Sequence, residues 1–387
     1  MERGRKAFRI LFIVLLGVAM VVPPFFPSST GTTFEFDPIV VEGNGGFAAA
    51  GFTGSGTAED PYVLRDISLN ASLELHGIRV SNTTVHFRIE GCTVHDSFSP
   101  DRDPLNISAS GSGILLINVT NAVIEDYLGD YNVRGVTVVS SSNVFINNSR
   151  FNNNIEAGVH LVDCLDGSVK VTNCTFTVGT GDDGVLIERC NGVEVSDNLI
   201  QGGENGIVVR AGGLATGGHL LSGNELTGQS LNGVLLGSST LTEDDKVLNN
   251  TIRGSGAPGI RISFATSAEA SGNEISGCSQ GVIVDWSGNR VSGNHLSNNT
   301  QGVLVRADGN LISGNAIEDG NLGVWVQASQ GNRVLNNTIL RMDEASAAGI
   351  YLGIGEVIDA RIEGNRVSSC YEGIRAATNP GRRYPGF

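Results

Sequence analysis

Short alternations of apolar and polar residues recur along most of the chain, and each begins at a glycine. The pattern is Gly-Val/Ile-x-Val/Ile, and it runs from GIRV at Gly77 to GIRA at Gly373. Most intervals between successive repeat glycines are 21–27 residues long. A second alternation lies between them, as in VSGNHL at 291–296. Alternation with a period of two predicts β-strands, so each repeat holds two short strands separated by Gly, Asn and Ser.

Strands this short, at a regular spacing and without helical segments between them, predict a solenoid. Each coil then hydrogen-bonds to the next at the strand spacing of about 4.8 Å. Equivalent residues of successive coils stack in columns, and the Val and Ile columns fill the bore. The repeat therefore predicts an all-β protein whose core runs the length of the stack.

The asparagine of the second alternation predicts a ladder at one turn of the solenoid. Asparagine tolerates the left-handed backbone conformation, and its amide bonds to the copies above and below it. We interpret this column as structural. Its expected members are Asn198, Asn224, Asn250, Asn273, Asn294, Asn315, Asn337 and Asn365.

Both motifs, together with GSGTAEDPYVL at 54–64, resemble the right-handed parallel β-helix proteins of the pectate-lyase-like superfamily. Within that superfamily the chain looks most like the NosD-like, carbohydrate-binding and sugar-hydrolysis (CASH) repeat proteins. The resemblance covers roughly residues 54–376. It implies a right-handed parallel β-helix of about 13 coils, about 60 Å long by the strand spacing. The residues that carry it are structural, so it is specific for fold and weak for activity.

Residues 1–30 differ in composition from the rest of the chain. A basic start precedes an apolar run, which is typical of a signal peptide or an N-terminal membrane anchor. We therefore expect an extracytoplasmic protein that meets the membrane only through this segment. Open solenoid ends expose strand edges, so we expect a cap and first strands at 31–75, the β-helix at 76–376 and a tail at 377–387.

The acidic charge balance narrows the class of partner. The formal net charge is −15, and only 17% of residues are charged. Such a surface repels nucleic acid, so we exclude nucleic-acid binding. The 53 glycines suit a turn-rich β protein.

The stretch GDDG at 181–184 holds the most suggestive acidic residues. Aligning the coils on the repeat glycine stacks Glu156, Asp182 and Glu204, with Asp183 one position later. Stacked carboxylates raise one another's pKa or recruit a cation. The column is therefore a candidate Ca²⁺ site, or with Asp183 a carboxylate group for sugar hydrolysis or lyase chemistry. Solvated acids on a turn are the alternative.

The same stretch resembles the acid pair of polygalacturonases. The companion motifs of that family, Asn-Thr-Asp, Gly-His-Gly and Arg-Ile-Lys, are missing from the neighbouring coils. This weakens the polygalacturonase interpretation, and it leaves other glycan hydrolysis open.

Cysteine and tryptophan positions raise two further questions. Cys164 and Cys190 each follow their repeat glycine by six residues in consecutive coils, which fits either a disulfide or a pair of stacked free thiols. Trp286 and Trp325 would form a sugar-stacking platform if both faced outward on one side, whereas an inward Trp325 would belong to the core.

The expected function is that of an extracytoplasmic surface protein which binds carbohydrate or a cell-surface partner along its side face. A polysaccharide hydrolase or lyase using the acidic patch is the first alternative, and a structural spacer of the cell envelope is the second. The expected partner is a polysaccharide or glycan, or another surface protein. No cofactor is certain, and Ca²⁺ is the candidate. Whether the protein is an enzyme stays open at this point.

Overall fold

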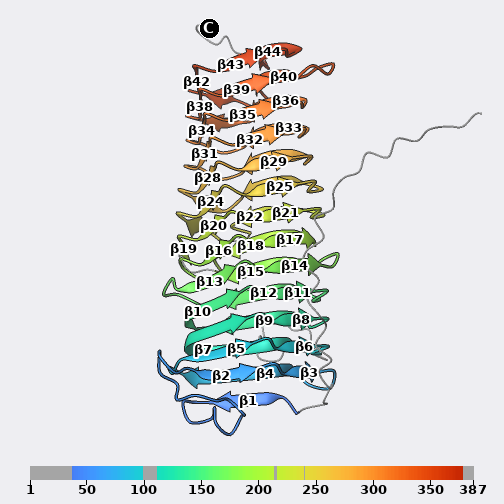
Figure 1. Cartoon of the computed structure of the whole chain (residues 1–387). Coiled ribbons are helices and arrows are strands. Elements are labelled where there is room, and N and C mark those ends of the chain that lie inside the picture. The colour runs from blue at the N-terminus through green and yellow to red at the C-terminus, as the bar shows by residue number, and fades with distance from the viewer. Residues whose placement is uncertain (1–36, 99–110, 213–215, 239, 378–387) are drawn as a thin grey trace, which may run out of the picture. The chain divides into compact units, whose positions relative to one another are not determined.

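The computed structural model describes residues 37–98, 111–212, 216–238 and 240–377. Within these ranges every regular element is a β-strand, and no helix there is long and apolar enough to cross a membrane. The strands wind into stacked coils from β1 (Ile39–Glu42) to β44 (Glu372–Ala376) (Figure 1). The predicted all-β, right-handed parallel β-helix is confirmed. The signal peptide or anchor expected at 1–30 and the tail beyond Ala377 lie outside the described residues.

Each coil contributes one strand to each of three faces, which we call A, B and C in chain order. Face A contains β1, β4 (His76–Thr83), β7 (Ser112–Glu125), β9 (Arg134–Val139), β12 (Ala157–Val162), β15 (Asp183–Glu188), β18 (Asn205–Arg210), β22 (Val234–Leu236), β26 (Pro258–Ile262), β30 (Gln280–Val284), β33 (Gln301–Val305), β36 (Leu322–Val326), β40 (Ala348–Leu352) and β44. Face B contains β2 (Tyr62–Arg65), β5 (Phe87–Glu90), β10 (Ser142–Asn147), β13 (Val169–Thr172), β16 (Glu194–Ser196), β20 (Leu220–Ser222), β24 (Lys246–Leu248), β28 (Glu269–Ser271), β31 (Arg290–Ser292), β34 (Leu311–Ser313), β38 (Arg333–Leu335) and β42 (Arg361–Glu363). Face C is a sheet of 13 strands, namely β3 (Ser68–Asn70), β6 (Thr93–His95), β8 (Leu128–Asp130), β11 (Arg150–Asn152), β14 (Thr175–Val178), β17 (Leu199–Gly202), β21 (Glu225–Thr227), β25 (Thr251–Arg253), β29 (Glu274–Ser276), β32 (His295–Ser297), β35 (Ala316–Glu318), β39 (Thr338–Leu340) and β43 (Arg366–Ser368).

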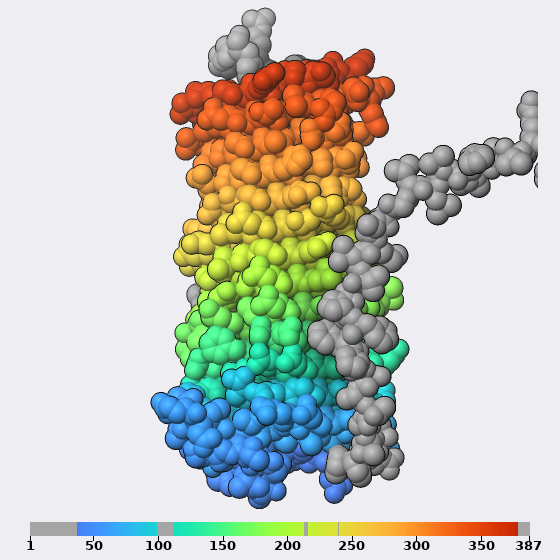
Figure 2. All heavy atoms as spheres, viewed as in Figure 1, coloured from blue at the N-terminus to red at the C-terminus, as the bar shows by residue number. Residues whose placement is uncertain are grey.

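Short extra strands widen the turn from face A to face B in two places. They are β19 (Thr216–Gly217), β23 (Thr242–Glu243) and β27 (Ala265–Thr266), then β37 (Ser329–Gln330) and β41 (Val357–Ile358). The long strand β7 turns the corner itself, because its first part pairs with β4 and its second part with β5. The pairings between strands of successive coils are parallel, for example Val185↔Ile207 and Ile200↔Leu226. In the space-filling view the coils follow one another as bands from blue to red (Figure 2).

The bore is filled by the apolar columns that the alternation predicts. Val, Ile and Leu from all three faces are buried in one continuous cluster, and on face C Phe151 stacks on Phe176 with ring centroids 4.8 Å apart. The repeat glycine is required by close packing. A Cβ on Gly302 would lie 2.4 Å from Ile317 Cγ2 and 2.5 Å from the carbonyl oxygen of Gly323. The glycine at the start of a face A strand thus allows a face C side chain and the backbone of the next coil to pack directly against the face A backbone.

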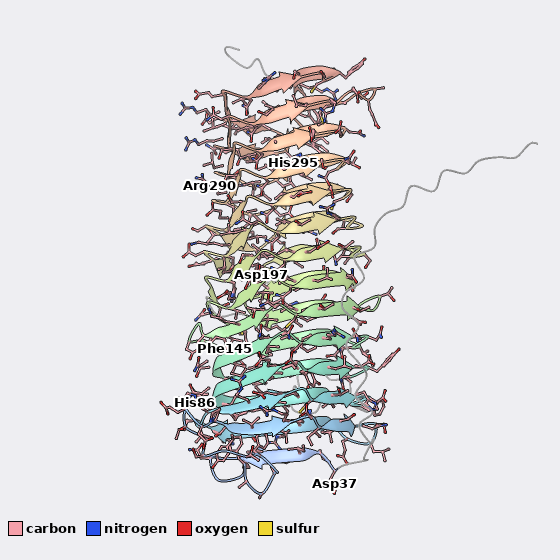
Figure 3. The ribbon with its side chains drawn as sticks, in the orientation of Figure 1. Asp37, His86, Phe145, Asp197, Arg290 and His295 are labelled. Atoms are coloured by element: carbon pink, nitrogen blue, oxygen red, sulfur yellow. The ribbon has the colours of Figure 1, made fainter. Side chains whose placement is uncertain are left out.

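The eight asparagines of the second motif form a hydrogen-bonded column at the turn from face B to face C. In each step the backbone N–H and the Nδ2 of one asparagine donate to Oδ1 of the next, as from Asn273 to Asn294 at 2.9 Å for both bonds. Asn294 lies between Arg290 on face B and His295 on face C, whose side chains project from the same coil (Figure 3). The left-handed residue is the one before the asparagine, such as Gly293 at φ 64°, and not the asparagine itself.

The N-terminal end of the bore is closed by aromatic rings. Phe47 stacks on Tyr62 with centroids 4.7 Å apart, and it packs edge-on against Phe52 at 5.1 Å. Phe47 and Phe52 are buried. An antiparallel bridge between Thr53 and Val63 also covers part of the edge of β2. The segment before β2 therefore covers the apolar interior of the first coil.

Candidate functional site on face A

Face A carries a column of side chains on the side of the sheet opposite the bore, and many of them are buried, as Leu115, Val208 and Leu304 are. On β15, for example, Val185 and Ile187 face the core while Leu186 between them belongs to the outer column. We call this the central column. Its members in register are Arg79, Leu115, Thr137, His160, Leu186, Val208, Leu235, Arg261, Ile283, Leu304, Trp325, Tyr351 and Arg375. Its chemistry changes along the solenoid, so two regions are described separately.

The acidic column expected from the sequence has the expected backbone register. The N–H of Asp183 donates to Glu156 O at 3.0 Å, and the N–H of Glu204 donates to Asp182 O at 2.7 Å. The side chains do not converge, and Glu156 instead pairs with Arg134 at 2.6 Å. No group of three or more His, Cys, Asp or Glu side chains in the described ranges is placed to hold a metal ion. The expected Ca²⁺ ligands Glu156, Asp182 and Glu204 thus share a register without forming a cation cage, because register does not fix side-chain direction at a turn.

The two aspartates of GDDG have different surroundings. Asp183 starts β15, and its side chain is only 12% exposed. Asn205 Nδ2 donates to Asp183 Oδ1 at 2.9 Å, and the Arg210 guanidinium lies 3.8 Å from Oδ2. Burial raises the pKa of Asp183, although the bond from Asn205 and the charge of Arg210 oppose the shift. Asp182 stays on the turn before the strand.

Glu188 is the second carboxylate of this region, and it contacts both His160 and Arg210. His160 Nε2 donates to Glu188 Oε2 at 3.0 Å, and Arg210 lies 3.3 Å from Oε1. Burial acts to raise the pKa of Glu188, but the His160 bond and the Arg210 charge outweigh it and lower the pKa to about 2. Burial also lowers the pKa of His160, although the bond to Glu188 opposes the shift. We call Arg134, Glu156, His160, Asp183, Glu188 and Arg210 the charged cluster.

Two residues of the charged cluster carry no signal among the candidate acids of the sequence. Glu188 and Arg210 are in register on β15 and β18, so their stacking follows from the pairing of these strands. Arg134 and His160 were not expected to take part, although both are buried and each pairs with an acid of the next coil. Their positions beside the repeat glycines Gly135 and Gly158 are the signal that would have found them.

The C-terminal half of face A carries aromatic side chains. Trp325 on β36 faces outward in the central column, where it stacks on Tyr351 of β40 with centroids 5.6 Å apart. The Arg375 guanidinium lies 5.3 Å from the centroid of the Tyr351 ring. We call these three residues the aromatic patch. Trp286 is elsewhere and packs on Phe264 at 4.9 Å, so the two tryptophans do not form one platform.

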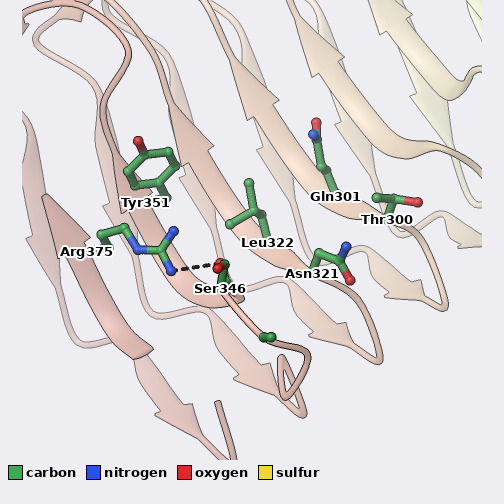
Figure 4. A pocket seen from close by; sticks show the side chains of 8 residues that line it. Thr300, Gln301, Asn321, Leu322, Ser346, Tyr351 and Arg375 are labelled. Carbon is green, nitrogen blue, oxygen red and sulfur yellow. Dashed lines mark hydrogen bonds between the residues drawn. The ribbon is translucent and has the colours of Figure 1, made fainter. Parts of the chain in front are cut away.

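A pocket of about 240 Å³ adjoins the aromatic patch (Figure 4). Arg375 donates to the carbonyl oxygen of Ser346 at 2.7 Å across one side of it, and it also pairs with Glu372. Two buried polar atoms in this region have no hydrogen-bond partner in the described structure, Gln301 Oε1 and Trp325 Nε1. The pocket is lined by Thr300, Gln301, Asn321, Leu322, Ala345, Ser346, Tyr351 and Arg375.

The cysteine pair is not bonded. Cys164 and Cys190 are free, buried thiols, and the Cys164 N–H donates to Cys190 Sγ at 3.4 Å. The two residues stack in consecutive coils as the repeat predicts, and the structure has the thiol alternative instead of the disulfide. Burial raises the pKa of the Cys190 thiol well above its usual range, which makes it a poor nucleophile.

Comparison with known proteins gives a family and distant structural likenesses. The family model described as "Right handed beta helix region" matches residues 76–243 and 241–382. Comparison with curated protein sequences finds no match. The solved structures similar to this chain include a double mutant of the periplasmic alginate epimerase AlgG, at 13% identity over 78% of this chain and 76% of that chain, with a TM-score of 0.49.

Two further structures show a similar degree of likeness. A mutant tailspike protein of E. coli bacteriophage HK620 in complex with a pentasaccharide has 14% identity over 81% of this chain and 70% of that chain, with a TM-score of 0.47. A hyperthermoactive exopolygalacturonase from Thermotoga maritima has 12% identity over 78% and 82%, with a TM-score of 0.45. None of these proteins is similar enough to transfer a substrate to this chain.

Proposed function

The chain belongs to the right-handed β-helix family, and from that premise we propose that it binds a carbohydrate on face A, at the pocket beside the aromatic patch. One observation carries the proposal. An outward pair of stacked aromatic rings adjoins a pocket lined by amide, hydroxyl and guanidinium groups. Sugar rings present C–H faces that pack on aromatic planes and hydroxyls that donate and accept hydrogen bonds, so this combination suits a glycan.

Two unpartnered polar atoms, one in the pocket lining and one in the adjoining aromatic patch, support a ligand that both donates and accepts. Buried polar atoms normally have partners, and leaving one without a partner costs about 1–3 kcal/mol. Gln301 Oε1 lacks a donor, and Trp325 Nε1–H lacks an acceptor. Hydroxyl groups of a bound sugar, directly or through water, supply both.

The charges around the pocket favour a neutral glycan over an acidic one. Arg375 already pairs with Glu372 and donates to the Ser346 carbonyl, so its charge is balanced within the chain. The net charge of −15 disfavours a polyanionic ligand at long range. An extracytoplasmic location, expected from the apolar segment within residues 1–30, fits a polymer of a cell surface.

A glycan array followed by calorimetry on the full chain tests this proposal. We expect binding to neutral oligosaccharides, and roughly two- to tenfold weaker binding after Tyr351→Ala, since an aromatic stacking contact contributes about 0.5–1.5 kcal/mol. Trp286→Ala is the matched control, because it removes an outward ring that does not line the pocket. Equal loss in both variants, or binding to acidic glycans alone, would contradict the proposal.

Hydrolysis of a glycan is a second candidate, and the charged cluster favours it. The environment moves the pKa of Asp183 up and that of Glu188 down to about 2, as an acid and base pair requires. However, both carboxylates already contact Arg210, and a purely structural network accounts for that arrangement. Release of reducing sugar that disappears in Asp183→Asn would establish this activity. Binding without release at any pH would remove it.

A further inference from the structure

Within the described part of the chain, the last coil, formed by β42, β43 and β44, is uncovered on its C-terminal side, unlike the coils before it. Ile374 on β44 is 58% exposed, whereas Ile350, which stacks beneath it, is buried. Ile362 on β42 and Val367 on β43 are partly exposed, while their partners Val334 and Ile339 are buried. These are bore-facing positions, so the end presents the apolar core itself.

The strand edges at this end are also unpaired. Each of β42, β43 and β44 pairs with the strand of the preceding coil, and no described strand covers its other edge. Asn365 accepts the ladder bonds of Asn337, and no asparagine among the described residues continues the ladder beyond it. An exposed apolar edge of this kind is a template for strand addition.

We propose that two copies of this chain associate through their C-terminal ends, as a closed two-fold dimer. At the N-terminal end the rings of Phe47, Phe52 and Tyr62 cover the apolar bore, so a head-to-tail filament would set an uncovered bore against a covered one. When two C-terminal ends meet face to face, each copy covers the exposed apolar residues of the other and pairs with its free strand edges. This inference is independent of the proposed glycan binding.

The lengths of the three edge strands select the position of the two-fold axis. An axis through the middle of face A pairs β44 with itself, antiparallel, and places β42 of one copy against β43 of the other. The five-residue β44 then meets an equal strand, and the three-residue β42 meets the three-residue β43. An axis through face B or face C would pair strands of three and five residues.

The side chains agree with this register. Centring β44 on Ile374 places that residue opposite its own copy, and centring β42 on Ile362 places it opposite Val367 of the other copy. Glu363 then faces Arg366 across the interface, twice by symmetry, with no like charges directly opposed. Directly opposite antiparallel residues point to the same side, so the apolar pairs continue the bore and the charged pairs lie outside it.

Light scattering on the full chain at micromolar concentration tests the dimer. We expect a two-chain particle for the parent and a monomer for Ile374→Lys, which puts a charge on the shared axis. Leu165→Lys, 51% exposed on a mid-solenoid turn, is the matched control and should stay dimeric. Circular dichroism melting checks that each variant is folded, as expected for exposed positions. A monomeric parent, or a dimer that survives Ile374→Lys, overturns the proposal.

Charge exchange tests the register independently. Glu363→Arg or Arg366→Glu alone opposes like charges across the interface, and each should weaken dimerisation roughly tenfold. The double variant restores opposite charges between copies, so its dimerisation should return to near the parent level. Both residues are exposed in the single chain, so folding is not at stake. Single variants that dimerise like the parent, or a double variant no better than the singles, would overturn this register.

Discussion

The charged cluster and the aromatic patch lie on the same side of face A, opposite the bore and about half a solenoid apart, and their polar groups differ in whether they have partners. In the charged cluster the ionised side chains pair within the chain, as Arg134 does with Glu156 and Arg210 does with Glu188. In the aromatic region the neutral atoms Gln301 Oε1 and Trp325 Nε1 have no partner. The comparison indicates that the first region stabilises the coils, whereas the second retains capacity to bind a ligand.

The largest effect is expected from breaking the charged cluster. Glu188→Gln removes the charge that both His160 and Arg210 contact, and we expect a loss of about 2 kcal/mol in the free energy of unfolding at pH 7. Glu274→Gln breaks the exposed pair with Arg253 and is the control, with an expected change below about 0.5 kcal/mol. Urea denaturation measures both.

The pH dependence of this difference gives a second readout of the same variant. The pKa of Glu188 falls from 4.5 to about 2 on folding, so its contribution is complete above pH 4.5 and is lost as the pH falls towards 2. Parent and Glu188→Gln should therefore converge in stability over that window. A constant difference from pH 7 to pH 2 would show that the loss is one of packing and not of charge.

In the aromatic region we expect a smaller change, in which stability is kept or raised while glycan affinity falls. Gln301→Leu removes a buried acceptor that has no partner, so stability should be unchanged or rise by up to about 1 kcal/mol. Glycan affinity should nevertheless fall roughly fivefold, because the acceptor for a sugar hydroxyl is gone. Thermal melting and calorimetry on one preparation separate the two. If Gln301→Leu lost stability and kept its glycan affinity, the aromatic region would be structural, and the contrast with the charged cluster would be wrong.

The fold was largely predictable, because each coil repeats the same short sequence motifs. The repeat glycine, the two alternations and the asparagine recur at nearly constant spacing, and the pairing of strands follows from them. The sequence left open whether Trp325 faces outward or into the core. In the structure its ring faces away from the bore and stacks on Tyr351.

The side-chain partnerships were much less predictable. Glu156, Asp182 and Glu204 stack as the alignment indicates, yet Glu156 turns to Arg134 on the preceding coil. Alignment on the repeat glycine gives backbone register, but the direction of a side chain at a turn depends on which neighbours offer a charge or a hydrogen bond. The aromatic patch had a usable signal, because Trp325, Tyr351 and Arg375 each stand two residues after a repeat glycine.

Tryptophan fluorescence tests the central claim most directly, because the chain has two tryptophans and only one belongs to the aromatic patch. Trp286→Phe leaves Trp325 as the single reporter, and Trp325→Phe leaves Trp286. On titration with a neutral oligosaccharide that binds the parent, the emission of Trp286→Phe should shift and saturate, while that of Trp325→Phe should stay constant. A saturating shift in Trp325→Phe alone would place the ligand outside the aromatic patch and contradict the account.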